Sequence, residues 1–198
     1  MSISFIGTGN VSTHLGRLLA SAGHDVYYGS RTPSGNQLSH GAAIAAAEVV
    51  VLAIPFSAVA EFAGQHRSHL AGKVVVDATN VINLADWSPI ELGNDSGGEQ
   101  LSRLLPDSVV VKAFNAVFAD TMTPENRAPR GIPLTVFVAG DEEEANARVA
   151  RLATDAGFRA LTVQGLRHAR YLEAMAHLNI SLALAGAGTK GGFTYLSA

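Results

Sequence analysis

Short runs of apolar residues alternate along the chain with stretches in which apolar residues recur every three or four positions. The runs are typical of buried parallel strands, and the spaced pattern is typical of helices that pack on a sheet. The predicted strands, some with the loop that follows, cover residues 3–6, 25–29, 49–55, 73–80, 108–115, 134–140 and 159–165. The predicted helices cover residues 11–22, 57–72, 97–106, 141–156 and 167–185. This alternation predicts an α/β fold of the Rossmann type, with a doubly wound, mostly parallel sheet and a C-terminal helix.

The pattern is thinnest between residues 32 and 48, where only one short helical piece fits before the next strand. A complete mononucleotide-binding half would place another full strand and helix there. We therefore expect an abbreviated third βα unit.

The first predicted strand ends in the sequence GTGNVS, residues 7–12. Gly7 permits a tight turn, and Gly9 lets backbone amides approach a pyrophosphate beside the N-terminus of the next helix. Ser12 stands where a third glycine or alanine is usual, but that position serves helix–strand packing and tolerates a small residue. The strand, turn and helix together predict a dinucleotide-binding turn, and the alternative is an ordinary tight connection.

The end of the second predicted strand indicates which dinucleotide binds. Residues 29–32 read GSRT, without the acidic residue that usually holds the ribose hydroxyls of NAD. Arg31 instead stands between two hydroxyl residues, and a guanidinium suits a dianionic phosphate in charge and geometry. The sequence predicts NADPH over NADH, with a solvated surface arginine as the alternative.

Small, apolar and amide residues follow the next strand ends, where the nicotinamide is expected. Thr79, Asn80 and Asn115 are candidates to hold a carboxamide or a second ring, although both asparagines could simply cap turns. Phe56 and Phe114 could pack on a planar ring or belong to the core. The cofactor-binding residues predicted at these ends are Ala53, Ile54, Pro55, Thr79, Asn80, Ala113, Phe114 and Asn115.

Groups for acid–base or metal chemistry are not evident, and we assign no catalytic residue and no metal ligand. Lys112 is the one lysine near a predicted strand end, and it could be a solvated side chain. His66 and His69 lie three apart without an evident third ligand, so we interpret them as surface histidines. The chain has no cysteine for a thiolate site. Hydride transfer between two redox cofactors needs positioning above all, which suits this composition.

Charge and hydropathy exclude other classes of partner. A net charge of −3 gives no electrostatic case for nucleic acid or an anionic membrane. The apolar runs are shorter than a bilayer span, and the N-terminus lacks the pattern of a signal peptide. We expect a cytoplasmic protein.

Six runs carry a more specific signal: FIGTGNVSTHLGRLLASAGHDVYYGSR, VVVLAIP, VVVDATN, VVKAFN, FVAGDEEEA and GLRHARYLEAMAHLNISLAL. Together they resemble the NADP oxidoreductases that depend on the deazaflavin coenzyme F420, and also the oxidoreductase domain of the six-transmembrane metalloreductases. The resemblance implies that Thr8, Asn10 and Val11 join the two glycines in the phosphate turn. It also implies that Ser30, Arg31 and the adjacent Thr32 hold the 2′-phosphate.

The same resemblance implies hydride transfer between NADP(H) and a deazaflavin (F420) or flavin acceptor. Residues 1–198 would form one NADP-binding domain, in which residues 134–198 pack on the sheet and form a dimer contact or the acceptor cleft. A homodimer is implied, and the apolar last helix suits an interface, although burial within one subunit is the alternative. A non-catalytic NADPH sensor and a reductase of small carbonyls or quinones remain alternatives. The glycine-rich tail, residues 186–198, is either a loop over the site or disordered.

Overall fold

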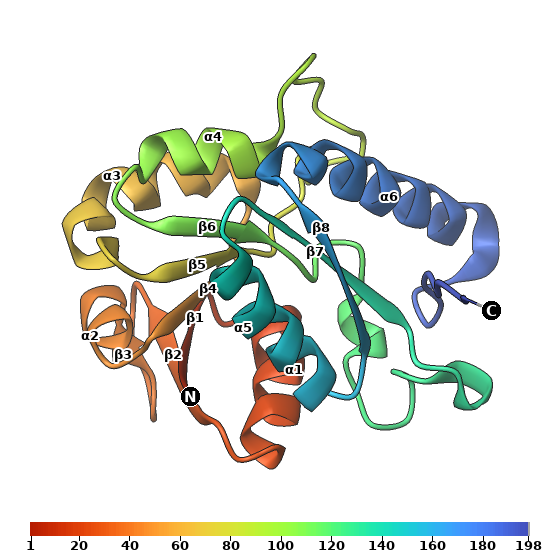
Figure 1. Cartoon of the computed structure of the whole chain (residues 1–198), viewed down its shortest axis with the longest axis horizontal. Coiled ribbons are helices and arrows are strands. Elements are labelled where there is room, and N and C mark those ends of the chain that lie inside the picture. The colour runs from red at the N-terminus through yellow and green to blue at the C-terminus, as the bar shows by residue number, and fades with distance from the viewer. Residues whose placement is uncertain (198) are drawn as a thin grey trace.

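A single sheet of eight strands forms the centre of the computed structural model, which describes residues 1–197 (Figure 1). The strand order is β3-β2-β1-β4-β5-β6-β7-β8. The strands are β1 (Ser2–Ile6), β2 (Asp25–Ser30), β3 (Leu38–Ser39), β4 (Val49–Leu52), β5 (Val74–Asp77), β6 (Val109–Lys112), β7 (Thr135–Gly140) and β8 (Arg159–Gln164). Neighbouring strands are parallel except β6 and β7, which pair antiparallel. The predicted Rossmann-type, mostly parallel sheet is confirmed.

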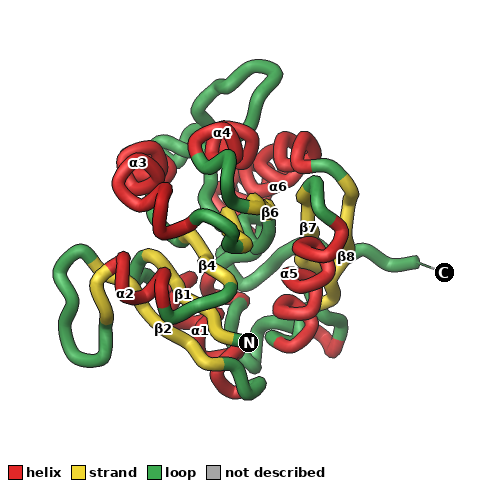
Figure 2. The backbone as a smooth tube through the Cα atoms, turned by 60° about the vertical axis from the view of Figure 1, so that its left-hand side comes forward, coloured by secondary structure: helices red, strands yellow, loops and turns green. Residues whose placement is uncertain are grey.

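Helices cover both faces of this sheet (Figure 2). They are α1 (Asn10–Ser21), α2 (His40–Ala45), α3 (Val59–Leu70), α4 (Gly97–Leu104), α5 (Glu143–Asp155) and α6 (Ala169–Leu182). One apolar cluster joins α1 and α5 to the strands, and a second joins them to α2, α3 and α4. Helices α1 to α5 thus each bury an apolar face against the sheet, whereas α6 packs mainly against α4.

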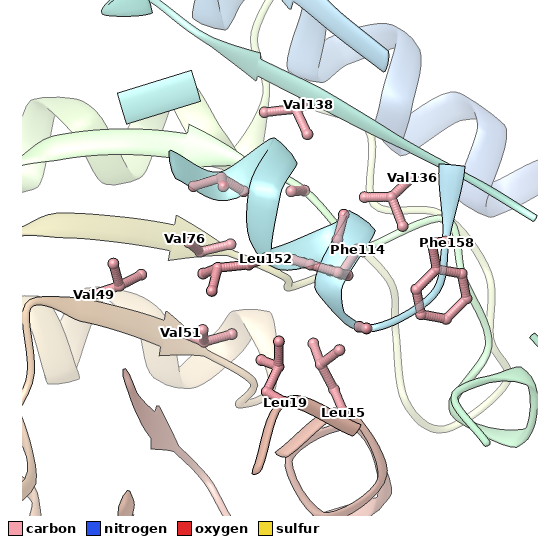
Figure 3. Packing of buried hydrophobic residues seen from close by; sticks show 14 of the residues in the cluster. Leu15, Leu19, Val49, Val51, Val76, Phe114, Val136, Val138, Leu152 and Phe158 are labelled. Carbon is pink, nitrogen blue, oxygen red and sulfur yellow. The ribbon is translucent and has the colours of Figure 1, made fainter. Parts of the chain in front are cut away.

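The central strands explain why the sequence shows continuous apolar runs rather than alternation. Val49 and Val51 of β4 lie in the cluster with α1 and α5, and Figure 3 shows both in this cluster with Leu19 and Leu152. Their neighbours Val50 and Leu52 lie in the other cluster. Successive side chains point to opposite faces, and both faces are covered, so every position of this strand is buried.

The third βα unit is as short as predicted. Strand β3 has two residues and α2 has six. Gly29 and Ser30 of β2 pair with Leu38 and Ser39 of β3, so the sheet ends on a very short edge strand. The carboxyl end of β2 is therefore covered by little more than the start of α2.

Strand β7 runs antiparallel to β6 because of the connection between these two strands. Residues 113–134 contain two single-turn 3-10 helices and no longer helix. Without a crossover helix, the chain begins β7 at the same edge where β6 ended. A crossover through α5 then places β8 parallel to β7.

The glycine-rich tail makes hydrogen bonds with the first residue of β7. The Thr135 amide donates to the Phe193 carbonyl at 2.8 Å, and the Tyr195 amide donates to the Thr135 hydroxyl at 3.0 Å. These contacts hold the described part of the tail against the start of β7. Residues 186–197 are therefore ordered rather than disordered, and a loop over the site stays a prediction.

No helix within residues 1–197 combines the length and the apolar character that crossing a bilayer requires.

Candidate functional site

The turn after β1 has a shape that requires glycine at its first position. Gly7 adopts a φ of +107°, and a Cβ added there would lie 2.4 Å from the Ala53 carbonyl oxygen. The Gly7 amide donates to the Gly29 carbonyl at 3.1 Å, and the Ala53 amide donates to the Ile6 carbonyl at 3.0 Å. The turn is therefore tied to the ends of both β2 and β4.

The second glycine faces open space instead. A Cβ added to Gly9 would meet nothing within 4 Å, and its φ of −78° is accessible to any residue. Gly9 is the N-cap of α1, no side chain caps the helix, and its first turn holds no acidic residue. The first amides of α1, which begins with Asn10 and Val11, are thus left to an anion. Ser12 is fully buried, as expected for a packing position.

A cavity of about 460 Å³ opens at the carboxyl ends of β1, β2 and β4, and we call it the carboxyl-edge cavity. Its volume is in the range of small-molecule sites. Nine of the predicted residues line it: Gly7, Thr8, Gly9, Ser30, Arg31, Thr32, Ala53, Ile54 and Pro55. The sequence did not predict seven further residues of its wall: Gly29, His40, Ser57, Ala58, Glu61, Phe62 and Gln65.

Arg31 lines this cavity, and its side chain has no protein partner among the described residues 1–197. The residue is exposed, and within residues 1–197 its guanidinium makes no salt bridge or hydrogen bond. The adjacent Ser30 hydroxyl accepts a hydrogen bond from the Thr32 amide at 3.2 Å, which fixes the local turn. A free guanidinium beside a bare helix N-terminus fits a ligand that carries a diphosphate and a further phosphate.

Lys112 is not a solvated side chain, so that reading of the sequence was wrong. The residue is fully buried at the end of β6, and its ammonium donates to the Thr79 carbonyl at 2.8 Å. It also forms ion pairs at 2.9 Å with the carboxylates of Asp77 and Glu173. We call Lys112, Asp77 and Glu173 the Lys112 cluster. The three acceptors use all three ammonium hydrogens.

The Lys112 cluster also ties α6 to α4. The Glu173 carboxylate accepts hydrogen bonds from the Gly97 and Gly98 amides at 3.1 and 3.2 Å, at the start of α4. Burial lowers the pKa of Lys112, but the carboxylates of Asp77 and Glu173 outweigh it and raise that pKa above its ordinary value. Lys112 thus stays charged and cannot act as an acid toward a ligand near neutral pH.

The second group of predicted residues lies beyond β5 and β6, outside the wall of the carboxyl-edge cavity: Thr79, Asn80, Ala113, Phe114 and Asn115. The Asn80 side-chain amide donates to the Asn115 carbonyl at 2.9 Å, and the Asn115 amide donates to the Leu172 carbonyl of α6 at 2.9 Å. These amides therefore join the two loops to α6, and their role toward a cofactor stays a prediction.

The two phenylalanines differ in burial. Phe114 has a φ of +65°, and its ring is part of the core cluster that Figure 3 shows. The core alternative is thus right for its ring, and only its main chain is left for a ligand. Phe56 is half-buried and packs at the edge of the other cluster.

The histidines lie closer together than their sequence positions indicate. His40 approaches His66 with ring centroids 5.5 Å apart, and His66 approaches His69 at 5.8 Å. His69 is exposed, but His66 is half-buried and so is not the surface residue that we expected. Over the described part of the chain, no group of three potential ligands could hold a metal ion.

Comparison with known proteins indicates the same class of ligand as the geometry of the site. Residues 2–81 match the model of the family described as NADP oxidoreductase, coenzyme F420-dependent. This segment contains the Gly7–Gly9 turn, Arg31 and the ends of β4 and β5.

Three relatives extend the similarity to most of the chain. The F420-dependent NADP reductase of Methanothermobacter marburgensis is 29% identical, over 89% of this chain and 89% of its own length. The crystal structure of a proposed F420-dependent NADP reductase from an Arthrobacter species superposes with a TM-score of 0.89 at 28% identity, covering 100% of both chains. The rat metalloreductase STEAP3 is 29% identical over 87% of this chain.

The chain spans only about a third, 36%, of the length of that metalloreductase. The resemblance to F420-dependent NADP oxidoreductases and to the metalloreductases, predicted from the sequence, is confirmed. By name, the Methanothermobacter relative is an NADP reductase and the Arthrobacter protein a proposed one, and both match this chain over nearly its whole length.

Proposed function

We propose that the chain is an NADP-dependent oxidoreductase that transfers hydride between NADP(H) and a deazaflavin or flavin acceptor. The observation that carries the proposal is the carboxyl-edge cavity, which joins the bare turn at Gly7–Gly9 to the uncommitted guanidinium of Arg31. Similarity over nearly the whole chain to a named NADP reductase and to a proposed one supports the same chemistry. Bound NADPH would supply the hydride.

The residues divide the dinucleotide between them. The amides after Gly7 would take the diphosphate, because Gly9 leaves nothing within 4 Å to block its approach. Arg31, with Ser30 and Thr32, would take the 2′-phosphate in the cavity. Ala53, Ile54 and Pro55, at the end of β4, would then direct the nicotinamide along the sheet edge toward β5 and β6.

The end of the sheet beyond β5 and β6 is proposed to orient the reacting rings rather than to move a proton. Lys112 is fully committed to Asp77 and Glu173, and the Asn80 and Asn115 amides hold the loops. Such a rigid, hydrogen-bonded edge can position two rings without donating a proton itself. Hydride transfer between a nicotinamide and a flavin-like ring needs no more, whereas reduction of a carbonyl needs a positioned acid.

The homodimer, the acceptor cleft formed by residues 134–198 and the cytoplasmic location stay predictions. Helix α6 exposes part of its apolar surface, since Leu178 is 53% and Leu182 is 47% exposed. Leu172 on the same helix is buried within the chain. The helix therefore serves the core on one side and leaves an apolar stripe on the other, which suits contact with a second copy.

The proposal is tested by mixing the protein with NADPH and, separately, F420, FMN, FAD and quinones, and following nicotinamide absorbance. Turnover with F420 or a flavin supports the proposal and identifies the acceptor. Tight NADPH binding without turnover on any of these would contradict the enzyme and favour an NADPH sensor. Turnover confined to quinones would contradict the proposed acceptor class.

A further inference from the structure

His40 is brought beside Arg31 by the shortness of the third βα unit. Ser30 of β2 is paired with Ser39 of β3, so the residues that follow them, Arg31 and His40, leave neighbouring strand ends at the same edge. Both line the carboxyl-edge cavity. His40 Cδ2 would lie 3.3 Å from a Cβ added to Gly29, which places the imidazole against the end of β2.

The imidazole is half-buried but has no polar partner. Over residues 1–197, neither ring nitrogen of His40 makes a hydrogen bond. Its ring instead meets the edge of Phe62, with centroids 5.3 Å apart, and lies near His66. A histidine that lines a cavity with both nitrogens free is available to a ligand.

Charged and titratable groups approach His40 from two elements, the end of β2 and helix α3. Arg31 approaches from the end of β2, and His66 approaches from α3, with His69 one turn further along that helix. Glu61, also on α3, lines the same cavity, but its carboxylate accepts from the Gln65 side chain at 3.0 Å. Burial, His66 and Arg31, in that order, lower the pKa of His40 in the free protein.

We propose that His40 is a second ligand of the 2′-phosphate of NADP(H), beside Arg31, and that it takes up one proton from solvent when the phosphate binds. The inference rests on the proposed function, because it needs NADP(H) in the carboxyl-edge cavity. The fork of Arg31 can bond two oxygens of a phosphate, and an imidazolium can donate to the third. No covalent bond changes: the proton moves from water to the imidazole.

A binding site with this pair discriminates between dinucleotides in a pH-dependent way. In the free protein, burial and Arg31 disfavour the protonated form of the His40 imidazole. The negative charge of the bound 2′-phosphate favours that form and so raises the pKa of His40. Preference for NADPH over NADH should therefore grow as the pH falls from about 8 to about 6, until the phosphate itself takes up a proton near pH 6. Arg31 alone would give no such slope, because its guanidinium stays charged throughout.

The test measures dissociation constants of NADPH and NADH at about pH 6, 7 and 8 for the wild-type chain, His40→Gln and the matched control His69→Gln. We expect the wild-type preference for NADPH to rise severalfold across this range and the preference of His40→Gln to be lower and flat. The exposed His69→Gln variant should behave as wild type. Calorimetry in buffers of different ionisation enthalpy should show proton uptake by the wild type with NADPH but not with NADH.

The outcomes separate this inference from the proposed function. A wild-type chain that never prefers NADPH contradicts the proposed function, and the inference fails with it. A clear preference that His40→Gln leaves unchanged overturns only the role of His40. Equal loss of NADPH and NADH binding in His40→Gln would place the imidazole on the shared adenosine and also overturn it. If His40→Gln fails to fold, absence of proton uptake in the wild type decides against the proposal.

Discussion

Two cationic side chains lie at strand ends in this molecule, and they differ in burial and in their contacts. Lys112, at the end of β6, is fully buried and bonded to Asp77, Glu173 and a carbonyl. Arg31, after β2, is exposed and makes no salt bridge within the described residues 1–197. Both positions look alike in sequence, so a strand-end cation alone does not reveal a ligand site.

The difference follows from what covers each strand. Strand β6 lies between β5 and β7, and α6 supplies Glu173 to its end while α4 packs nearby (Figure 1). Strand β2 is flanked by the two-residue β3, which brings no acidic side chain to Arg31. A buried charge loses its hydration and is stable only with protein partners. A charge at an exposed strand end stays hydrated and needs no protein partner, so it is available to a ligand.

Removal of the buried cation is expected to have the largest effect. Lys112→Met should leave Asp77 and Glu173 buried without a counter-charge, so the free energy of unfolding should fall by about 3–5 kcal/mol. Urea denaturation followed by circular dichroism measures the change. Lys190→Met, at an exposed position of the tail, is the control and should lie within about 0.5 kcal/mol of wild type. A loss below about 1 kcal/mol for Lys112→Met would show that the Lys112 cluster does not stabilise the fold at the ends of β5 and β6.

The two glycines of the turn should separate folding from binding. Gly7→Ala places a Cβ against the Ala53 carbonyl at a positive φ, so we expect a loss of about 1–3 kcal/mol in stability. Gly9→Ala meets no protein atom and should change stability by about 0.5 kcal/mol at most. It should nevertheless weaken NADPH and NADH binding alike, by about tenfold or more, because both carry the diphosphate. Unchanged binding in Gly9→Ala would remove the diphosphate from this turn.

Removing the charge of the exposed Arg31 should change the preference for NADPH over NADH and leave the stability of the fold unchanged. Arg31→Gln removes a charge-assisted contact of about 1.5–3 kcal/mol, which is on the order of a 10- to 150-fold loss in NADPH affinity. NADH lacks the 2′-phosphate, so its affinity should change little. Fluorescence titration with both dinucleotides measures the ratio, and Arg17→Gln on the exposed side of α1 is the control. Equal losses for the two dinucleotides would show that Arg31 reads something other than the phosphate.

The smallest effect concerns the free protein in mild acid. The pKa values of His40 and His66 are lowered in the fold, chiefly by burial, so the unfolded chain binds more protons as the pH falls below about 6.5. Stability should be constant above that pH and decline below it. His40→Gln should reduce the decline of the melting temperature between pH 7.5 and 5.5 by about 1–2 °C, whereas His69→Gln should not. An identical decline in all three proteins would mean that His40 does not titrate as the structure indicates.

The sequence predicted features that one strand–turn–helix unit determines. It did not predict contacts between residues far apart along the chain. The Gly7–Gly9 turn and Arg31 were predicted because a strand, a turn and a helix within one unit determine their positions. Lys112 was misread because Glu173 reaches it from α6, far along the chain. His40 was missed because β3, which carries the chain to the cavity, has only two residues and no recognisable period.

A crystal structure of the chain with NADPH tests the central claim most directly. We expect the 2′-phosphate within hydrogen-bonding distance of the Arg31 guanidinium and the diphosphate over the amides that follow Gly7. A dinucleotide bound elsewhere, or one whose 2′-phosphate points into solvent away from Arg31, would contradict the account.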